Sequence, residues 1–333
     1  MAVIVGLFCF ASGAKAWDLV GHKLVTELAL KGLPDDFPAW VKDDARVTRL
    51  LYLAPEPDRW RGQGAAVLNH INSPDHYMDL EDLDVFGLTV ETLPRFRNEF
   101  IELLATFRAQ HPDIAPYDPT RDAAHVYSTP GLIPYAIIER YWKLASSWST
   151  LRTLQEYSDV VSEADIESAR NNVIQEMGLL SHFVGDAHQP LHMSKHHHGW
   201  RGENPEGYTT GYGIHDYVDG TALVANKINS KTLADKVRPA ANMDETDPWP
   251  QILKFMARTE SRVEPLYKLE KLGKLEAKSG HDFFERCVLE GGSNLAGLWL
   301  AAYKISKIDD YMSTALEALR AINQPVEEEV PAK

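Results

Sequence analysis

Hydrophobic positions along most of this chain recur at the spacing of an α-helix. The first such run returns to one side of a helix at Leu19, Val20, Leu24, Val25, Leu28 and Leu30. Similar patterns cover residues 97–109, 132–145, 163–186, 249–272 and 281–308. Alternation with a period of two residues, typical of strands, is scarce. The pattern therefore predicts an all-α protein.

Two segments depart from the helical pattern. Residues 196–212 are rich in Gly, Asn, Pro and Thr, which is typical of a loop. Residues 324–333 contain two prolines and a run of three glutamates, and this composition predicts a disordered tail. We find no internal repeat and no linker that would place a domain boundary between residues 17 and 323. We therefore expect residues 17–323 to form one mainly helical domain.

The first sixteen residues have the features of a signal peptide. An apolar run from Ala2 to Ala11 precedes Ala14-Lys15-Ala16, which fits an A-x-A cleavage site, although no basic residue opens the run. Cleavage after Ala16 would make Trp17 the new N-terminus and would export the protein, either as a secreted or as a periplasmic protein. A buried first helix is the alternative interpretation.

Composition narrows the function classes. The 333 residues are 44% hydrophobic, enough for a large core, and carry a formal net charge of −14. This charge argues against a protein that coats duplex DNA, but not against a metal-dependent nuclease, whose ions supply positive charge locally. Of the two cysteines, cleavage would remove Cys9 and leave Cys287, which we expect to be buried. No run of about 20 apolar residues follows the N-terminus, so no membrane span is predicted.

Histidines and carboxylates cluster in the middle of the chain. His182 and Asp186 are four residues apart in a helical pattern, so both side chains can face one ion. His215 and Asp219 repeat that spacing, and His192 follows Pro190, which should end the preceding helix. Imidazole and carboxylate are suitable zinc ligands. The alternative is a set of core histidines and solvated carboxylates.

The segment from His182 to His192 reads HFVGDAHQPLH. It resembles the H-F-x-G-D-x-x-Q-P-L-H signature of the superfamily formed by the S1/P1 single-strand nucleases and the zinc-dependent phospholipases C. Further matching elements follow the family order from Trp17 to Asp219, while the last hundred residues match no motif of the family. The resemblance implies an all-α domain of this type.

The resemblance also implies three zinc ions and a hydroxide that bridges two of them and attacks phosphorus. The first ion would be held by Asp58, His76, His182 and Asp186. The second would be held by His192, His215 and Asp219. The third would be held by the amino nitrogen and carbonyl oxygen of Trp17, by His22 and by Asp186. Asp186 would thus bridge two ions, Asp58 would help to handle the proton of the attacking water, and Arg61 would brace the phosphoryl oxygens.

The substrate implied by the resemblance is single-stranded DNA or RNA. The activity would be that of an endonuclease with 3′-nucleotidase activity that leaves 5′-phosphate ends. Tyr77 could stack on a base and Asp79 could accept hydrogen bonds from it. In the alternative interpretation Tyr77 packs in the core and Asp79 caps the next helix.

Some positions are similar to the phospholipase branch. Val218 stands where the nuclease branch usually has Trp, and the preceding Gly213-Ile214-His215 is closer to phospholipase-like members. A phospholipase C that hydrolyses phospholipid head groups is therefore the alternative function. We expect no obligate protein partner. The run His196-His197-His198 has no counterpart in the signature; we expect a solvated loop, although stray metal binding or a place at the site entrance stays open.

Overall fold

The computed structural model of the protein describes residues 17–114 and 117–323. Its α-helices are α1 (Leu19–Gly32), α2 (Asp44–Leu53), α3 (Glu56–Arg61), α4 (Ala66–Asn72), α5 (Arg97–Gln110), α6 (Ile133–Glu156), α7 (Glu163–Asp186), α8 (Gly213–Asp216), α9 (Ala222–Ala225), α10 (Trp249–Glu260), α11 (Val263–Lys271), α12 (Lys278–Ile305) and α13 (Asp310–Asn323). Within the described residues, β pairing is limited to one isolated bridge between Met78 and Gly131. The all-α prediction is confirmed.

Two predicted segments, the signal peptide at residues 1–16 and the tail at residues 324–333, lie outside the described part of the chain. Within that part, no helix combines the length and the apolar character needed to cross a bilayer.

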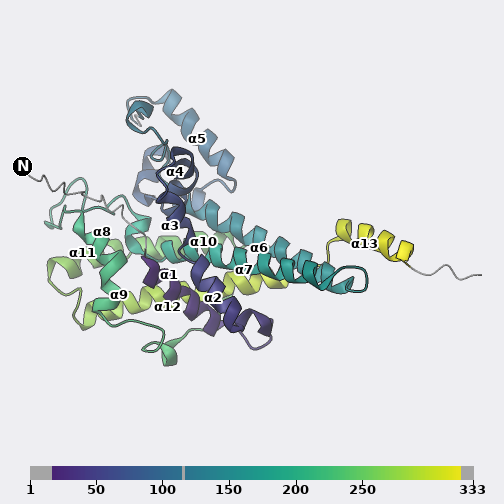
Figure 1. Cartoon of the computed structure of the whole chain (residues 1–333). Coiled ribbons are helices and arrows are strands. Elements are labelled where there is room, and N and C mark those ends of the chain that lie inside the picture. Colours follow the sequence, from purple (N-terminus) through teal and green to yellow (C-terminus); the bar gives the residue numbers. More distant parts are fainter. Residues whose placement is uncertain (1–16, 115–116, 324–333) are drawn as a thin grey trace, which may run out of the picture.

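Helix α7 is the centre of the fold, with α1, α2, α6 and α12 packed around it (Figure 1). It begins with a capping box, in which the Ser162 hydroxyl accepts a hydrogen bond from Asp165 N and the Asp165 carboxylate accepts one from Ser162 N, both at 3.2 Å. From Met177 to Asp186 every side chain is buried. Because neighbours surround this end of the helix, its polar side chains must find their partners inside the protein.

Small residues let the surrounding helices approach closely. A Cβ atom added to Gly178 of α7 would lie 2.5 Å from Leu53 Cβ of α2. On α12, a Cβ atom at Gly292 would lie 2.6 Å from Leu28 Cβ of α1. These contacts fix how α1, α2, α7 and α12 are placed against one another, and with them the side chains of the candidate site.

Three predicted helical segments differ from the structure. The predicted segment 281–308 corresponds to α12, which begins at Lys278 and ends at Ile305. Helix α6 continues past residue 145 to Glu156, because Trp148 and Leu151 keep its buried face apolar. The predicted segment 249–272 is divided into α10 and α11 at residues 261–262. At the break, Arg262 pairs with Glu290 of α12, and this contact holds the chain where it changes direction. Residues 196–212 contain no helix or strand, as predicted.

Candidate metal centre

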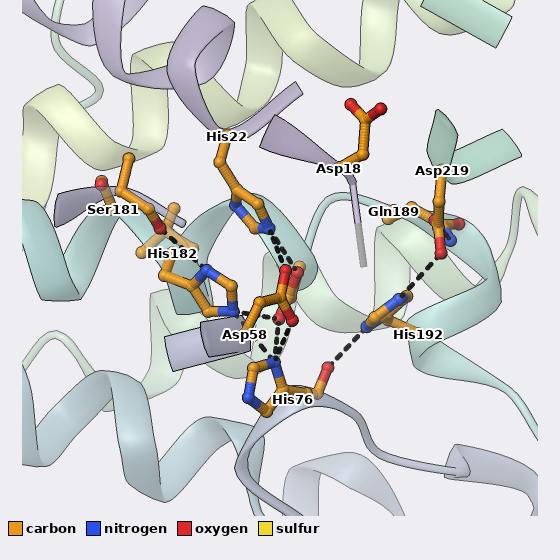
Figure 2. A network of polar contacts seen from close by, with 12 residues as sticks. Asp18, His22, Asp58, His76, Ser181, His182, Gln189, His192 and Asp219 are labelled. Atoms are coloured by element: carbon orange, nitrogen blue, oxygen red, sulfur yellow. Dashed lines mark hydrogen bonds and ion pairs between the residues drawn. The ribbon is translucent and has the colours of Figure 1, made fainter. Parts of the chain in front are cut away.

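The predicted ligands converge on the C-terminal end of α7. His182 and Asp186 lie in its last turns, and Asp186 is the last residue of the helix. His22 comes from α1, Asp58 from α3, and His76 from the short 3-10 helix Ser73–His76. In Figure 2 the imidazoles of His22, His76 and His182 and the carboxylate of Asp58 point toward one another.

The first cluster is built around the carboxylate of Asp186. Its Oδ2 lies 3.0 Å from His76 Nδ1 and 3.2 Å from His182 Nε2, and its Oδ1 lies 3.4 Å from His22 Nε2. The Asp58 carboxylate lies beside it, with Oδ1 3.8 Å from His76 Nδ1 and Oδ2 3.9 Å from His22 Nε2. Five side chains from four elements thus place their donor atoms in one small space.

A second cluster lies next to the first. His192 comes from the 3-10 helix Pro190–Met193, His215 from α8, and Asp219 from a π-helix at Tyr217–Thr221. Asp219 Oδ2 is 2.9 Å from His215 Nε2 and 3.9 Å from His192 Nε2, and the two Nε2 atoms are 3.3 Å apart. The two clusters are joined by a hydrogen bond from His192 Nδ1 to the carbonyl oxygen of His76, at 2.7 Å.

Backbone acceptors set the orientation of two of these imidazoles. His182 Nδ1 lies 2.8 Å from the carbonyl oxygen of Ala54, and His192 Nδ1 makes the contact with His76 O described above. A carbonyl oxygen can only accept, so each Nδ1 carries a proton and each Nε2 is the nitrogen left to bind an ion once it gives up its own proton. This is the arrangement in which an outer hydrogen bond fixes the tautomer of a metal-binding histidine.

Burial keeps two imidazoles of the first cluster, those of His22 and His76, neutral, whereas the carboxylates of Asp186 and Asp58 raise the pKa of His182 in spite of its burial. Burial lowers the pKa of His22 to about 3, with His182 adding to the effect and Asp186 opposing it. Burial, with Arg61 adding, also holds the pKa of His76 well below its usual range. Both rings are therefore neutral near pH 7, and a neutral imidazole is the form that binds a metal ion.

The carboxylates of Asp186 and Asp219 remain ionised in spite of their burial. Burial by itself raises the pKa of Asp186, but His182 and His192 outweigh it and hold that pKa well below the usual range. In the same way, His215 and His192 outweigh burial and lower the pKa of Asp219. Burial raises the pKa of Asp58. Ionised buried carboxylates require cationic partners or metal ions.

Several atoms of these clusters that could bind a metal ion are fully buried and make no hydrogen bond within the described part of the chain. They are both ring nitrogens of His22, Asp58 Oδ1, His76 Nε2, Asp186 Oδ1 and Asp219 Oδ2. Asp186 also ends α7, where the helix dipole is negative and a carboxylate is unfavourable without a cation. Buried polar groups are normally paired, so these residues fit metal ions well.

Three groups of donors lie close enough together to hold an ion. They are His22, Asp58 and His182; His76, His182 and Asp186; and His192, His215 and Asp219. The third group has the composition that the resemblance implies. The first two groups contain only predicted ligands, but they assign them to ions differently from the resemblance. Asp58, Asp186 and His182 lie in one space, so they can be assigned to ions in more than one way.

Trp17 lies directly before α1, the helix that carries His22, and its side chain is completely buried. A Cβ atom at Gly21 would lie 2.8 Å from Trp17 Cβ, so the indole packs tightly on the first turn of α1. The backbone NH of the next residue, Asp18, donates to the carbonyl oxygen of Asp219 at 3.1 Å. These contacts bring Trp17 close to Asp219, a residue of the second cluster. That its amino group binds metal stays a prediction.

Arg61 lies at the edge of the first cluster. Its Nη1 is 3.8 Å from Asp58 Oδ1, three residues earlier on α3, and its side chain is 24% exposed. A guanidinium that is partly open to solvent can reach a bound anion while it stays beside the buried carboxylates. That Arg61 binds the phosphoryl oxygens stays a prediction.

Tyr77 and Asp79 are both partly buried. The Tyr77 hydroxyl donates to the carbonyl oxygen of Val126 at 3.3 Å, and its ring centre lies 6.3 Å from that of His197. Asp79 precedes a 3-10 helix, but its side chain makes no capping hydrogen bond and lies 3.5 Å from His197 Nδ1. The role of both residues in substrate binding stays a prediction.

Two further residues near the clusters had no predicted role. Gln189 Nε2 donates to Asp219 Oδ1 at 2.6 Å, and its side-chain oxygen accepts from Leu191 N at 2.6 Å. Its place in the quoted signature, three residues before His192, was the available signal. His188 is turned away: its Nδ1 contacts Val184 O and its Nε2 contacts Asn294 of α12.

The three consecutive histidines do not form a solvated loop. The buried ring of His196 stacks on Trp200 at 4.0 Å, and its Nδ1 accepts from Arg201 N. His198 Nδ1 lies 3.2 Å from His215 Nδ1. Burial, with His215 adding, lowers the pKa of His198 to about 4, so this ring is neutral near pH 7.

With this geometry established, comparison with protein families gives a match. Residues 138–298 match the S1/P1 nuclease family. The resemblance that we predicted from the sequence is confirmed over this segment, and it supports a hydrolase that acts on phosphodiester bonds. No curated protein gives a match to the chain.

The matched segment contains only part of the candidate centre. It includes His182, Asp186, His192, His215 and Asp219. Trp17, His22, Asp58 and His76 precede it in the sequence, and the packing of α1 and the α3–α4 region brings their side chains to those of the matched segment. The fold therefore joins residues of the matched segment and residues that precede it into one set of donors.

Proposed function

We propose that this protein is a zinc-dependent phosphodiesterase that cleaves single-stranded DNA and RNA to 5′-phosphate products and removes the phosphate from 3′-nucleotides. The observation that carries the proposal is the buried set of imidazoles and carboxylates around Asp186, in a chain whose residues 138–298 match the S1/P1 nuclease family. Export before action is part of the proposal, because cleavage after Ala16 would expose the amino group of Trp17.

Zinc bound by these residues would lower the pKa of water toward neutrality and offset the negative charge of the phosphate. Three ions would be held by the sets that the resemblance implies, with Asp186 shared between two of them. The outer hydrogen bonds of His182 and His192 turn their Nε2 atoms toward the clusters before any ion arrives. Such preorganisation reduces the cost of assembling the site.

The protein's own residues would orient the substrate and move the proton. Arg61, partly exposed at the rim, would donate two hydrogen bonds to the phosphoryl oxygens as negative charge develops on them. Asp58 lies 3.8 Å from Arg61, and burial raises its pKa, so its carboxylate is a better proton acceptor than an exposed aspartate.

The test uses protein cleaved before Trp17 with its zinc content verified. Single-stranded DNA, RNA, a 3′-mononucleotide and phosphatidylcholine are offered in parallel, each with and without a chelator. We expect chelator-sensitive cleavage of both nucleic acids, with 5′-phosphate ends, and release of phosphate from the 3′-mononucleotide.

Release of phosphocholine with both nucleic acids intact would contradict the proposal and assign the protein to the phospholipase C branch. Chelator-resistant cleavage of DNA would contradict the metal requirement. If nucleic acids are cleaved, Asp79→Asn is the next variant, since loss of base preference without loss of phosphate release from 3′-nucleotides would support a base-contacting role.

A further inference from the structure

His215 differs from the other two histidines that turn an Nδ1 atom outward from the clusters. His182 and His192 each place that nitrogen against a backbone carbonyl, at 2.8 and 2.7 Å. His215 instead places it 3.2 Å from His198 Nδ1, a side-chain atom. The ring centres of His198 and His215 are 4.8 Å apart. The outer partner of this candidate ligand is therefore a residue that can be replaced.

The contacts of His215 Nε2 decide which of the two rings donates the hydrogen bond between the Nδ1 atoms. Its Nε2 points at Asp219 Oδ2, 2.9 Å away, and at His192 Nε2, 3.3 Å away. To bind an ion in this cluster, Nε2 must offer a lone pair, so the proton of the neutral ring must be on Nδ1. His198 Nδ1 must then accept that proton's hydrogen bond.

We infer that His198 is a positioning residue for the ion of the second cluster: it accepts a hydrogen bond from His215 Nδ1 and so holds the tautomer in which His215 Nε2 can bind zinc. The inference rests on the proposed function, because it concerns the same zinc centre. His198 lies outside the segment His182–His192 that resembles the family signature.

The surrounding residues hold His198 in this place. Its ring lies against Tyr212, with centres 4.9 Å apart. The other two histidines of the run, His196 and His197, are held by contacts of their own. His196 stacks on Trp200, and its carbonyl oxygen accepts a hydrogen bond from Tyr267 of α11.

His197 Nδ1 lies 3.1 Å from Ser194 O and 3.5 Å from Asp79. The three histidines thus have three separate partners, and only His198 contacts a residue of the second cluster by a hydrogen bond.

The experiment measures zinc retention without substrate. Cleaved wild-type protein and the variants His198→Phe, His198→Asn and His197→Phe are dialysed against a series of chelator concentrations, and bound zinc is counted by mass spectrometry. Phenylalanine keeps the ring against Tyr212 but cannot accept a hydrogen bond. Asparagine restores an acceptor close to the position of Nδ1. His197→Phe is the control from the same run.

We expect His198→Phe to lose one equivalent of zinc at a chelator concentration about 10-fold to 100-fold lower than the wild type, the usual effect of removing an outer partner. His198→Asn and His197→Phe should retain zinc as the wild type does. Thermal unfolding of each variant in excess zinc shows whether it is folded.

Wild-type retention by His198→Phe would overturn the inference, as would equal loss in His198→Asn or simultaneous loss of all the zinc. A wild-type protein that binds no zinc would instead refute the proposed function itself, so the two failures can be told apart.

Discussion

At the scale of single residues, the carboxylate of Asp186 is shared by three imidazoles of the first cluster. Its two carboxylate oxygens lie within 3.4 Å of nitrogens from His22, His76 and His182, and the side chain has no exposed surface. It also carries a negative charge at the C-terminal end of a helix.

We therefore expect Asp186→Asn to reduce phosphodiesterase activity by more than about 100-fold, since outer partners alone are worth about 10-fold to 100-fold. The amide removes one negative charge and one lone-pair oxygen from a place shared by several donors. Turnover and zinc content are measured together. Asp36→Asn, a change at an exposed carboxylate, is the control. Near-normal turnover with full zinc content would show that Asp186 is not a ligand.

Residue spacing predicted two pairs of side chains in the site, whereas His22, Asp58 and His76 were assigned to it only by the family resemblance. The i, i+4 pairs His182–Asp186 and His215–Asp219 do face one place each, because α7 and the α8 region are helical. Spacing could not reveal His198, because its contact with His215 depends on how an irregular loop folds back. Nor could spacing divide the five side chains of the first cluster among ions. The contacts between their carboxylate oxygens and imidazole nitrogens range from 3.0 to 3.9 Å, so the division depends on differences of less than 1 Å.

At the scale of elements, the close approach of α7 to α2 positions the donor-bearing end of α7. Gly178 lies two turns before Asp186, and its backbone packs on Leu53. A larger residue there must push the two helices apart, because the blocking atom is the Cβ of Leu53 rather than the end of a flexible side chain.

Gly178→Ala should therefore destabilise the protein by about 1–3 kcal/mol through overpacking, in spite of the better helix propensity of alanine. The matched control is Gly291→Ala in α12, where the new Cβ atom would meet its nearest neighbours at 3.4 Å, an ordinary contact. That change should be neutral or stabilising by up to about 1 kcal/mol. Denaturant unfolding measures both. Equal stability of the two variants would contradict the packing account.

Helix positions were predictable where hydrophobic spacing is regular, and less so at helix ends. The expected span 163–186 agrees with α7, whose start is marked by Ser162 and Asp165. The break between α10 and α11 was missed, because apolar spacing continues across residues 261–262, although Pro265 in the first turn of α11 lacks the NH that a continuous helix would need there.

At the scale of the whole molecule, the candidate centre joins distant parts of the sequence. α1, the α3–α4 region, α7 and the segment 190–219 all supply donors, and each would be held to the others by shared ions. Figure 1 shows α13 beyond the far ends of α6 and α7, away from α8 and α9. The ions should therefore stabilise the part of the fold around α1 and α7 most.

Removing zinc with a chelator should lower the thermal unfolding temperature by several degrees or more. Each ion contributes about 2.7 kcal/mol when its free concentration is 100 times its dissociation constant, and loss of the ions leaves buried carboxylates without cations. Calorimetry with and without chelator measures the shift, and excess zinc should restore it. An unfolding temperature that does not change on removal of all bound zinc would contradict this account.

The central claim, that these buried histidines and aspartates form a zinc centre, is tested most directly by anomalous X-ray diffraction at the zinc absorption edge, on crystals of the protein cleaved before Trp17. We predict three peaks: one among Asp58, His76, His182 and Asp186, one among His192, His215 and Asp219, and one beside Trp17, His22 and Asp186. An anomalous map with no peak within bonding distance of Asp186 or Asp219, from protein that is active and contains zinc, would contradict it.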